Sequence, residues 1–249
     1  MEAKRIIVFD LDGTLTESKS RLDDEMAVLL EGLLDRKKVA VISGGSYRQF
    51  EKQFIKNIGG KLENLFLFPT CATQFYRFEN DSFVKVYEDR LKADDKKRIM
   101  ESFERVLDEI GYEKPKKTYG EVIEDRGTQI TFSALGQNAP LEEKVMFDPD
   151  NRIREKIRKN LARYLPDFEI KLGGTTSIDI TRKGIDKAYG IRKIQEYLGI
   201  GKEEILFVGD ALYAGGNDHA VLREGVQCIG VRNHDECKGL IRTWLNGKD

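Results

Sequence analysis

Residues 6–16 read Ile-Ile-Val-Phe-Asp-Leu-Asp-Gly-Thr-Leu-Thr and combine an apolar run, two carboxylates and a turn. The first four residues are β-branched or aromatic without a polar break, which is typical of a strand buried on both faces of a parallel sheet. Asp10 comes where that strand should end, and open α/β sheets hold their ligands at the carboxyl ends of their strands. Asp12, Gly13 and Thr14 follow, so this stretch predicts an α/β fold with two acids in one binding crevice.

Two carboxylates in this arrangement suit phosphoryl transfer through a carboxylate nucleophile. Asp10 would attack phosphorus, and Asp12 would protonate the leaving oxygen and later deprotonate the attacking water or hydroxyl. An Asp-rich turn without chemistry would contain the same pair of acids. The complete Asp-Leu-Asp-Gly-Thr is more specific, and it resembles the first motif of the haloacid dehalogenase-like (HAD) phosphotransferases. That resemblance implies a second strand ending in Ser or Thr, a later Lys and a late acidic cluster.

The composition limits the class of protein. The 249 residues suffice for one large domain or two smaller ones, and 42 basic against 43 acidic residues leave the chain nearly neutral. We therefore expect neither a nucleic acid nor a membrane as partner. A basic and then apolar leader and an apolar run of membrane length are both missing, which predicts a cytoplasmic protein. The three cysteines have no close-spaced pair, so neither a disulfide framework nor a zinc site is expected.

A second apolar strand, residues 39–42, ends at Ser43 and is followed by Gly44. A hydroxyl at a strand end, beside glycines whose amides can face an anion, is what a transferring phosphate oxygen needs. A plain glycine-rich turn would look similar. The position one crossover helix after Asp10 favours Ser43 and Gly44 as phosphate-binding residues, with Ser46 as a helix cap.

The composition changes after a predicted hairpin of residues 73–78 and 83–87. A charge-dense stretch leads into an amphipathic helix, and the order then reads helix, strand, strand, helix, strand, strand. This predicts an inserted α+β domain of roughly a hundred residues, a usual size for an independent unit, which would cover the active site. We predict a Rossmann-like core with a parallel sheet over residues 1–87 and 183–249, and the α+β cap over residues 88–182.

The first two strands of this insert are predicted at residues 121–123 and 129–132. The core resumes with a helix over residues 185–198, which has Lys187 near its start, and a buried strand that ends in Asp210. A lysine near a helix start is usually solvated, and Gly-Asp after a strand is often only a turn. In an active site, Lys187 would neutralise the phosphate and an aspartyl-phosphate intermediate.

Asn217 and Asp218 open the next predicted helix. Together with a substrate phosphate, Asp10, Asp210 and Asp218 would place several negative charges close together, each uncompensated pair costing on the order of a few kcal/mol. A hard cation is therefore required, and oxygen ligands with room for water favour Mg²⁺. We assign Asp10 and Asp210 as carboxylate ligands and the main-chain oxygen of Asp12 as a third, with Asn217 and Asp218 orienting the shell.

The order Asp10, Ser43, Lys187, Asp210 matches the four motifs of the HAD family. An insert between the second and third motifs marks its type IIB, or Cof-like, branch with the larger C2-type cap, mostly sugar-phosphate phosphatases. Residues 209–218, Gly-Asp-Ala-Leu-Tyr-Ala-Gly-Gly-Asn-Asp, resemble the last motif of the eukaryotic-type phosphomannomutases. The resemblance spans nearly the whole chain, and it implies a phosphorylated sugar as substrate and a homodimer formed through the cap.

By that resemblance the cap would bind the sugar and its non-reacting phosphate through Arg126, Lys144, Ser177 and Asp179. The family pattern, however, has arginines where this chain has Gln137 and Lys144. Bidentate phosphate binding needs the planar fork of Arg, and Gln carries no charge. A mutase must hold and reorient a bisphosphate intermediate, so a weakened distal site should impair mutase action more than hydrolysis.

The Asn-Gly that the family has after its third core strand is replaced here by Thr-Cys-Ala-Thr at residues 70–73. These departures favour a Mg²⁺-dependent phosphatase of a hexose phosphate or similar small metabolite, acting through an aspartyl-phosphate on Asp10. One alternative is a phosphomannomutase that interconverts mannose 1-phosphate and mannose 6-phosphate. Another is a catalytically silent ligand-binding module, against which the intact Asp motifs and Lys187 argue.

Overall fold

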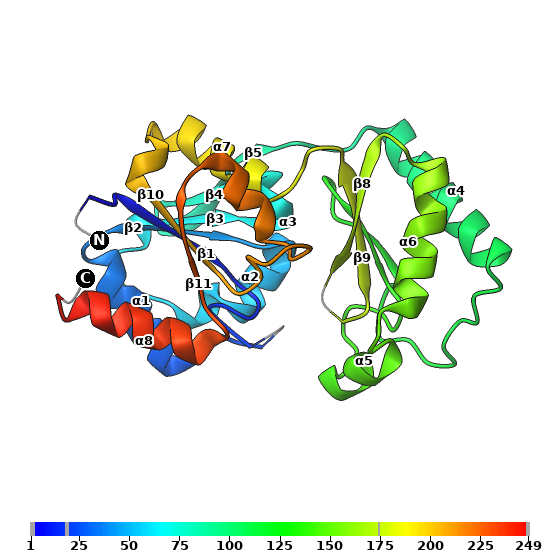
Figure 1. Ribbon diagram of the computed structural model, residues 1–249, viewed down its shortest axis with the longest axis horizontal. Helices are drawn as coiled ribbons and strands as arrows, with labels where there is room; N and C mark the ends of the chain where they lie inside the picture. Colours follow the sequence, from blue (N-terminus) through cyan, green and yellow to red (C-terminus); the bar gives the residue numbers. More distant parts are fainter. Residues whose placement is uncertain (1–2, 18–19, 174, 248–249) are drawn as a thin grey trace. The chain divides into compact units, whose positions relative to one another are not determined.

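The computed structural model describes residues 3–17, 20–173 and 175–247, and the chain divides into two compact units (Figure 1). The core unit consists of Met1–Glu88 and Ile185–Asp249, and the insert unit consists of Asp89–Gly184. The first unit is therefore discontinuous in sequence, and the second is a single continuous segment.

Within the described residues, the core unit is built on a seven-stranded sheet. Its strands are β1 (Ile6–Asp10), β2 (Lys38–Ile42), β3 (Leu65–Phe68), β4 (Gln74–Glu79), β5 (Ser82–Glu88), β10 (Ile205–Gly209) and β11 (Gln227–Gly230). The order is β11-β10-β1-β2-β3-β4-β5, with the first five parallel and β4–β5 forming the predicted antiparallel hairpin. The parallel arrangement brings the carboxyl ends of β1, β2 and β10 to one edge of the sheet.

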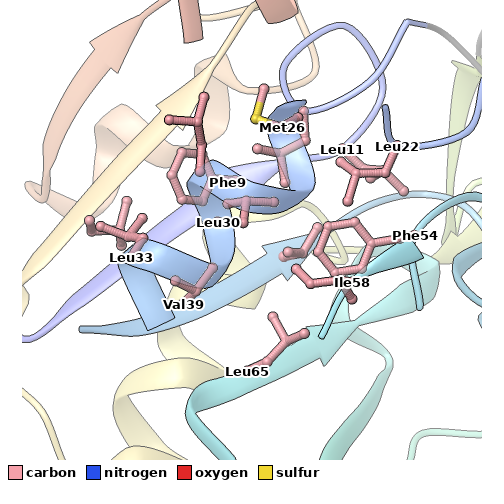
Figure 2. Close-up of a cluster of buried hydrophobic side chains, with 14 of the residues drawn as sticks. Phe9, Leu11, Leu22, Met26, Leu30, Leu33, Val39, Phe54, Ile58 and Leu65 are labelled. Carbon is pink, nitrogen blue, oxygen red and sulfur yellow. The ribbon is translucent and has the colours of Figure 1, made fainter. Parts of the chain in front are cut away.

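Helices cover both faces of this sheet (Figure 1). They are α1 (Asp24–Leu34), α2 (Tyr47–Gln53), α7 (Lys187–Leu198) and α8 (His234–Leu245), with a short turn α3 (Pro69–Ala72) and 3-10 segments at Ile55–Asn57, Leu62–Asn64, Lys202–Glu204 and His219–Glu224. Ile7 and Phe9 of β1 pack with α1 and α8, whereas Ile6 and Val8 pack with α7. Figure 2 shows Phe9 directed toward Leu30 of α1. Burial on both faces explains why β1 has no polar residue before Asp10.

The insert unit packs two long helices and a short one with a four-stranded antiparallel sheet in the order β6-β7-β9-β8. Its elements are α4 (Ala93–Glu109), β6 (Ile123–Asp125), β7 (Ile130–Ser133), α5 (Leu141–Phe147), α6 (Arg152–Tyr164), β8 (Phe168–Gly173) and β9 (Ser177–Arg182). Phe103 of α4 and Ile157 of α6 pack with Phe132 and Ile178 of the sheet. This unit thus has a hydrophobic core of its own.

Two elements of the insert unit differ from the sequence prediction. Strand β6 begins at Ile123 instead of ending there, because Asp125 pairs with Ile130 across a tight turn and the polar residues of an edge strand carry no apolar signal. Helix α5 was not predicted, since its apolar Leu141 and Val145 are exposed and do not mark a buried face. Among the helices that the structure describes, none has both the length and the apolar character that crossing a bilayer requires.

Candidate active site

Asp10 is the last residue of β1 and is almost completely buried, with 3% of its surface exposed. Its register partner on β2 is Ile42, so Ser43 follows at the same edge of the sheet, and Asp210 directly follows β10. Parallel pairing therefore brings the ends of three predicted motifs to this edge.

Lys187 is the first residue of α7, and its side chain is buried beside two carboxylates. Its Nζ lies 2.6 Å from Asp10 Oδ1 and also donates to Asp218 Oδ1. Burial alone would lower the pKa of Lys187, but the two carboxylates outweigh it and raise the pKa above its usual range. Lys187 is therefore a buried cation shared by two acids. Its contact with Asp218 was not predicted from the sequence.

Burial has the opposite effect on Asp10. Loss of solvent raises the pKa of this carboxyl well above its ordinary value, Lys187 opposes the shift, and the nearby charges of Asp218 and Asp12 add to it. Among the described residues, Asp10 Oδ2 has no hydrogen-bond partner. An orphaned carboxylate oxygen in a buried acidic site is where a cation or an electrophilic phosphorus would bind.

Asp10, Asp210 and Asp218 each offer an oxygen within 4.8 Å of the others. Three carboxylates facing one ammonium leave an excess of negative charge, and an all-oxygen donor set suits a hard divalent cation. Asp218 Oδ1 accepts from Lys187 and its Oδ2 accepts from Ala211 N at 2.9 Å, so both its oxygens are already engaged. The residues present thus fit a divalent metal, with Asp10 and Asp210 the freer donors.

The turn after β1 orients Asp210. Thr14 Oγ1 donates to Asp210 Oδ1 at 3.3 Å, and Gly13 has φ of +94°. A Cβ on Gly13 would lie 2.6 Å from Asp210 Oδ2, so only glycine allows this approach. The contact of Thr14 with Asp210 was not predicted from the sequence, because it depends on the β1–β10 pairing, which the local pattern does not encode.

Four other predicted site residues lie in the loops around this cluster. Asp12 lies in the same turn and forms an isolated bridge with Thr16. Ser43 is buried, and its Oγ accepts from the amide of Gly45 at 3.1 Å, while Gly44 lies in the same loop and is partly exposed. Asn217 is exposed beside the buried Asp218. Ser46 occupies the expected N-cap position of α2, and its amide donates to Gln49 Oε1 at 2.7 Å.

In the insert unit, three of the predicted substrate-binding residues form one hydrogen-bonded chain. Ser177 Oγ lies 2.8 Å from Ser133 Oγ, Gln137 Nε2 donates to Ser133 Oγ at 2.6 Å, and Lys144 Nζ donates to Gln137 O at 2.8 Å. Sequence reasoning missed Ser133 as the residue that joins them. Its register pairing with Ser177 across β7 and β9 supplies that link.

The other two residues have partners of their own. Asp179 lies two residues after Ser177, on the same face of β9, and Thr131 Oγ1 donates to Asp179 Oδ1 at 2.7 Å. Arg126 lies in the β6–β7 turn, where its Nε donates to Glu124 Oε2 at 2.9 Å. The predicted residues of the insert unit are thus grouped around β7 and β9, with Arg126 in the turn at one end.

Comparison with known proteins places the chain in a family. Residues 26–239 match the family described as "Eukaryotic phosphomannomutase". The chain belongs to this family. It is 30% identical over 243 residues to a phosphomannomutase of Encephalitozoon cuniculi, with 94% of this chain and 91% of that protein covered. It is 26% identical over 221 residues to a phosphomannomutase of Saccharomyces cerevisiae, with 87% and 84% covered.

Solved structures show the fold of this phosphomannomutase-family chain. A Plasmodium falciparum IMP-nucleotidase has a TM-score of 0.70 at 16% identity, with 98% of this chain and 69% of that chain covered. A trehalose-6-phosphate phosphatase of Aspergillus fumigatus has a TM-score of 0.57 at 19% identity, with 99% and 94% covered. The predicted HAD family and its α/β fold are confirmed. The chain is an HAD-family phosphotransferase or phosphohydrolase.

Proposed function

We propose that the chain is a phosphomannomutase that interconverts mannose 1-phosphate and mannose 6-phosphate through a phosphorylated Asp10. The observation that carries the proposal is the buried contact of Lys187 with Asp10, at 2.6 Å inside the carboxylate cluster, in a chain that matches phosphomannomutases over most of its length. The family match favours this reading over the sequence-based preference for a phosphatase.

In the proposed reaction, a carboxylate oxygen of Asp10 attacks a phosphorus of a sugar bisphosphate. The bond from phosphorus to the sugar oxygen breaks, and Asp12 protonates that oxygen. A hydroxyl of the bound sugar monophosphate, deprotonated by Asp12, then attacks the aspartyl-phosphate and restores the Asp10 carboxylate. Lys187 and Ser43 bind the phosphoryl oxygens, and the buried site excludes water that would compete with the sugar hydroxyl.

A divalent cation completes this site, and we propose Mg²⁺. Asp10, Asp210 and the main-chain oxygen of Asp12 would hold it, while Asp218 and Asn217 orient these ligands. When bound, it neutralises charge on the transferring phosphoryl group. The close contacts of Thr14 and Gly13 with Asp210 support this donor set.

We propose that the insert unit binds the far end of the sugar phosphate. Arg126 would supply the positive charge, and Ser177, Asp179 and Gln137 would supply hydrogen bonds. The buried hydroxyls that surround these side chains support a polar binding face.

A phosphatase remains a second candidate, because this binding face carries less free positive charge than an arginine pair would. Gln137 is uncharged, and Lys144 is only 5% exposed and donates to the main chain of Gln137. A weakly held sugar monophosphate would leave before its hydroxyl attacked the aspartyl-phosphate, and water would then hydrolyse the aspartyl-phosphate.

Phosphorus NMR with Mg²⁺ and mannose 1-phosphate, with and without a catalytic amount of glucose 1,6-bisphosphate, distinguishes the two activities. A mutase forms mannose 6-phosphate only when the bisphosphate is present. Accumulation of inorganic phosphate without any 6-phosphate would contradict the mutase and support the phosphatase. An Asp10→Asn variant is the control, and it should show neither product.

A further inference from the structure

The turn α3 that follows β3 has an uncommon backbone. Thr70, Cys71 and Ala72 have φ values of +50°, +55° and +64°, so three consecutive residues that carry a Cβ coil in the left-handed sense. L-residues other than glycine avoid this region, and a run of three persists only where the surroundings hold it in place.

Side chains on both sides hold this turn. Thr73 Oγ1 lies 2.8 Å from Thr70 O and 2.7 Å from Thr70 Oγ1, and it is buried. The hydroxyl of Tyr87, on β5, donates to Ala72 O at 2.6 Å. The strained conformation is therefore maintained by hydrogen bonds from outside the three residues.

The backbone amides of the turn point at the predicted phosphate-binding loop. Thr70 N donates to Gly45 O and Cys71 N donates to Ser43 O, both at 2.9 Å. An extended chain or a right-handed turn at these residues would direct the two amides elsewhere. The left-handed conformation thus anchors the carbonyls on either side of Gly44.

The same turn also contacts the helix that carries Lys187. Gly190 lies in the first turn of α7, and a Cβ placed on it would lie 3.1 Å from Ala72 Cβ and 2.9 Å from Ile42 Cδ1. Helix α7 therefore packs closely on Ala72. One strained turn touches both elements that would bind the transferring phosphate.

We propose that residues 70–72 are a positioning turn that sets the Ser43–Gly45 loop and the start of α7, and so aligns Ser43 Oγ and Lys187 Nζ for phosphoryl transfer at Asp10. This inference rests on the phosphoryl-transfer step of the proposed function and not on the identity of the sugar.

Thr73 offers a matched pair of test variants. Thr73→Val removes the hydroxyl that holds the turn and keeps the branched shape, whereas Thr73→Ser keeps the hydroxyl. We expect Thr73→Val to lower kcat roughly tenfold to a hundredfold with KM little changed, as a small misplacement of catalytic groups does. Thr73→Ser should restore most of kcat. A kcat per folded molecule equal to that of the wild type in Thr73→Val would overturn the inference.

A second pair tests the contact with α7 and does not depend on Thr73. Gly190→Ala inserts a methyl group against Ala72 and Ile42 and should lower kcat, whereas adding Ala72→Gly removes one of the two opposing groups and should recover part of the loss. Equal kcat in Gly190→Ala and the wild type would contradict the coupling. So would a double variant in which the separate effects of Gly190→Ala and Ala72→Gly on kcat, expressed as free energies, simply add.

Binding of beryllium trifluoride with Mg²⁺, followed by fluorine NMR, tests the alignment of Ser43 and Lys187 at Asp10 without requiring catalysis. This anion mimics the phosphoryl group on a carboxylate. Weaker binding in Thr73→Val and Gly190→Ala than in the wild type supports the positioning turn. If the wild type neither turns over nor binds the anion, phosphoryl transfer at Asp10 fails together with the inference. If the wild type does both and the variants match it, only the positioning turn is wrong.

Discussion

At the scale of single residues, the site depends on residues that close contacts with neighbouring carboxylates hold in place. Gly13 is placed where any Cβ would meet Asp210, and Lys187 is enclosed by two acids. Substitutions at these two positions should therefore change metal affinity or activity as well as the free energy of unfolding.

Gly13→Ala should cost more than backbone strain alone. Alanine at a positive φ costs about 1–2 kcal/mol in the free energy of unfolding, and here its Cβ would also displace Asp210, 2.6 Å away. Gly184 is a matched control, because it has φ of +83° and nothing lies within 4 Å of a Cβ placed there. Gly184→Ala should show the strain without loss of metal affinity. Equal metal affinity in the two variants, measured by calorimetry, would refute the role of Gly13.

Lys187→Met should abolish activity and destabilise the metal-free protein. Removing the ammonium leaves Asp10 and Asp218 buried without their cation, a loss of about 3–5 kcal/mol for a broken buried pair. Burial raises the pKa of Asp10 and Lys187 opposes that shift, so without Lys187 the folded state binds the Asp10 proton still more readily, and the variant should gain more stability than the wild type as pH falls. Urea unfolding with a chelator at pH 7 and pH 5 should thus show a smaller deficit at pH 5. A deficit that grows toward pH 5 would show that protonation of Asp10 does not compensate for the lost ammonium.

At the scale of elements, α1 and α8 are joined by charges at the surface of the core unit. Asp23 caps α1, because its Oδ1 accepts a hydrogen bond from Met26 N at 2.9 Å. Its Oδ2 also forms an ion pair with Lys238 Nζ of α8 at 2.8 Å. Burial alone would raise the pKa of Asp23, but the bonds from Lys238 and Met26 lower it below its ordinary value. The pKa of Lys238 is raised, because Asp23 and its acidic neighbours outweigh the effect of burial.

Asp23→Asn separates the ion pair from the cap, because Asn caps helices about as well as Asp. The side chain of Asp23 is 44% exposed, so the lost pair should cost only about 0.5–1 kcal/mol near pH 7. A lowered carboxyl pKa contributes stability above the unfolded value of 3.8 and loses it as pH falls through the folded value. The stabilities of the wild type and Asp23→Asn should thus converge once the pH falls below the lowered pKa of Asp23.

Asp23→Ala removes the cap as well and should lose about 1 kcal/mol more than Asp23→Asn. Chemical unfolding at several pH values measures both variants. A difference between the wild type and Asp23→Asn that does not change with pH would show that the charge of Asp23 is irrelevant to stability.

Several elements were predictable because their signal is local. The apolar run before Asp10 and the one before Ser43 are typical of buried parallel strands, and both strands lie at the predicted positions. The left-handed turn at residues 70–72 was not predictable, because none of its residues is a glycine, the residue type that indicates a positive φ. Its conformation is imposed by partners distant in sequence, such as Tyr87.

The same limit applies to the site. The motif order was sufficient to bring Asp10, Ser43 and Asp210 to one edge of the sheet, since parallel strands align their carboxyl ends. The sharing of Lys187 between Asp10 and Asp218 was not predictable, because it depends on how α7 packs. Side-chain partnerships across elements require tertiary contacts that a one-dimensional pattern does not contain.

At the scale of the whole molecule, the chain joins two units with separate hydrophobic cores. The insert unit is continuous in sequence, and its sheet pairs only with itself among the described residues. We predict that residues 89–184 fold alone, since a segment of about a hundred residues with its own core is a usual independent domain. Thermal unfolding of the isolated segment 89–184, followed by circular dichroism, should then show one cooperative transition. A gradual, non-cooperative loss of signal would mean that this unit needs the core unit to fold.

The proposed mutase requires Asp10 to carry the phosphoryl group between two positions of a sugar. The most direct test is to mix the protein with Mg²⁺ and labelled glucose 1,6-bisphosphate, quench with acid after milliseconds, and locate the phosphoryl group by peptide mass spectrometry. We expect a phosphorylated peptide containing Asp10, whose label passes to mannose 1-phosphate when that sugar is added in a chase. Label that leaves only as inorganic phosphate would contradict the mutase, and a phosphoryl group on any other residue would contradict phosphoryl transfer through Asp10.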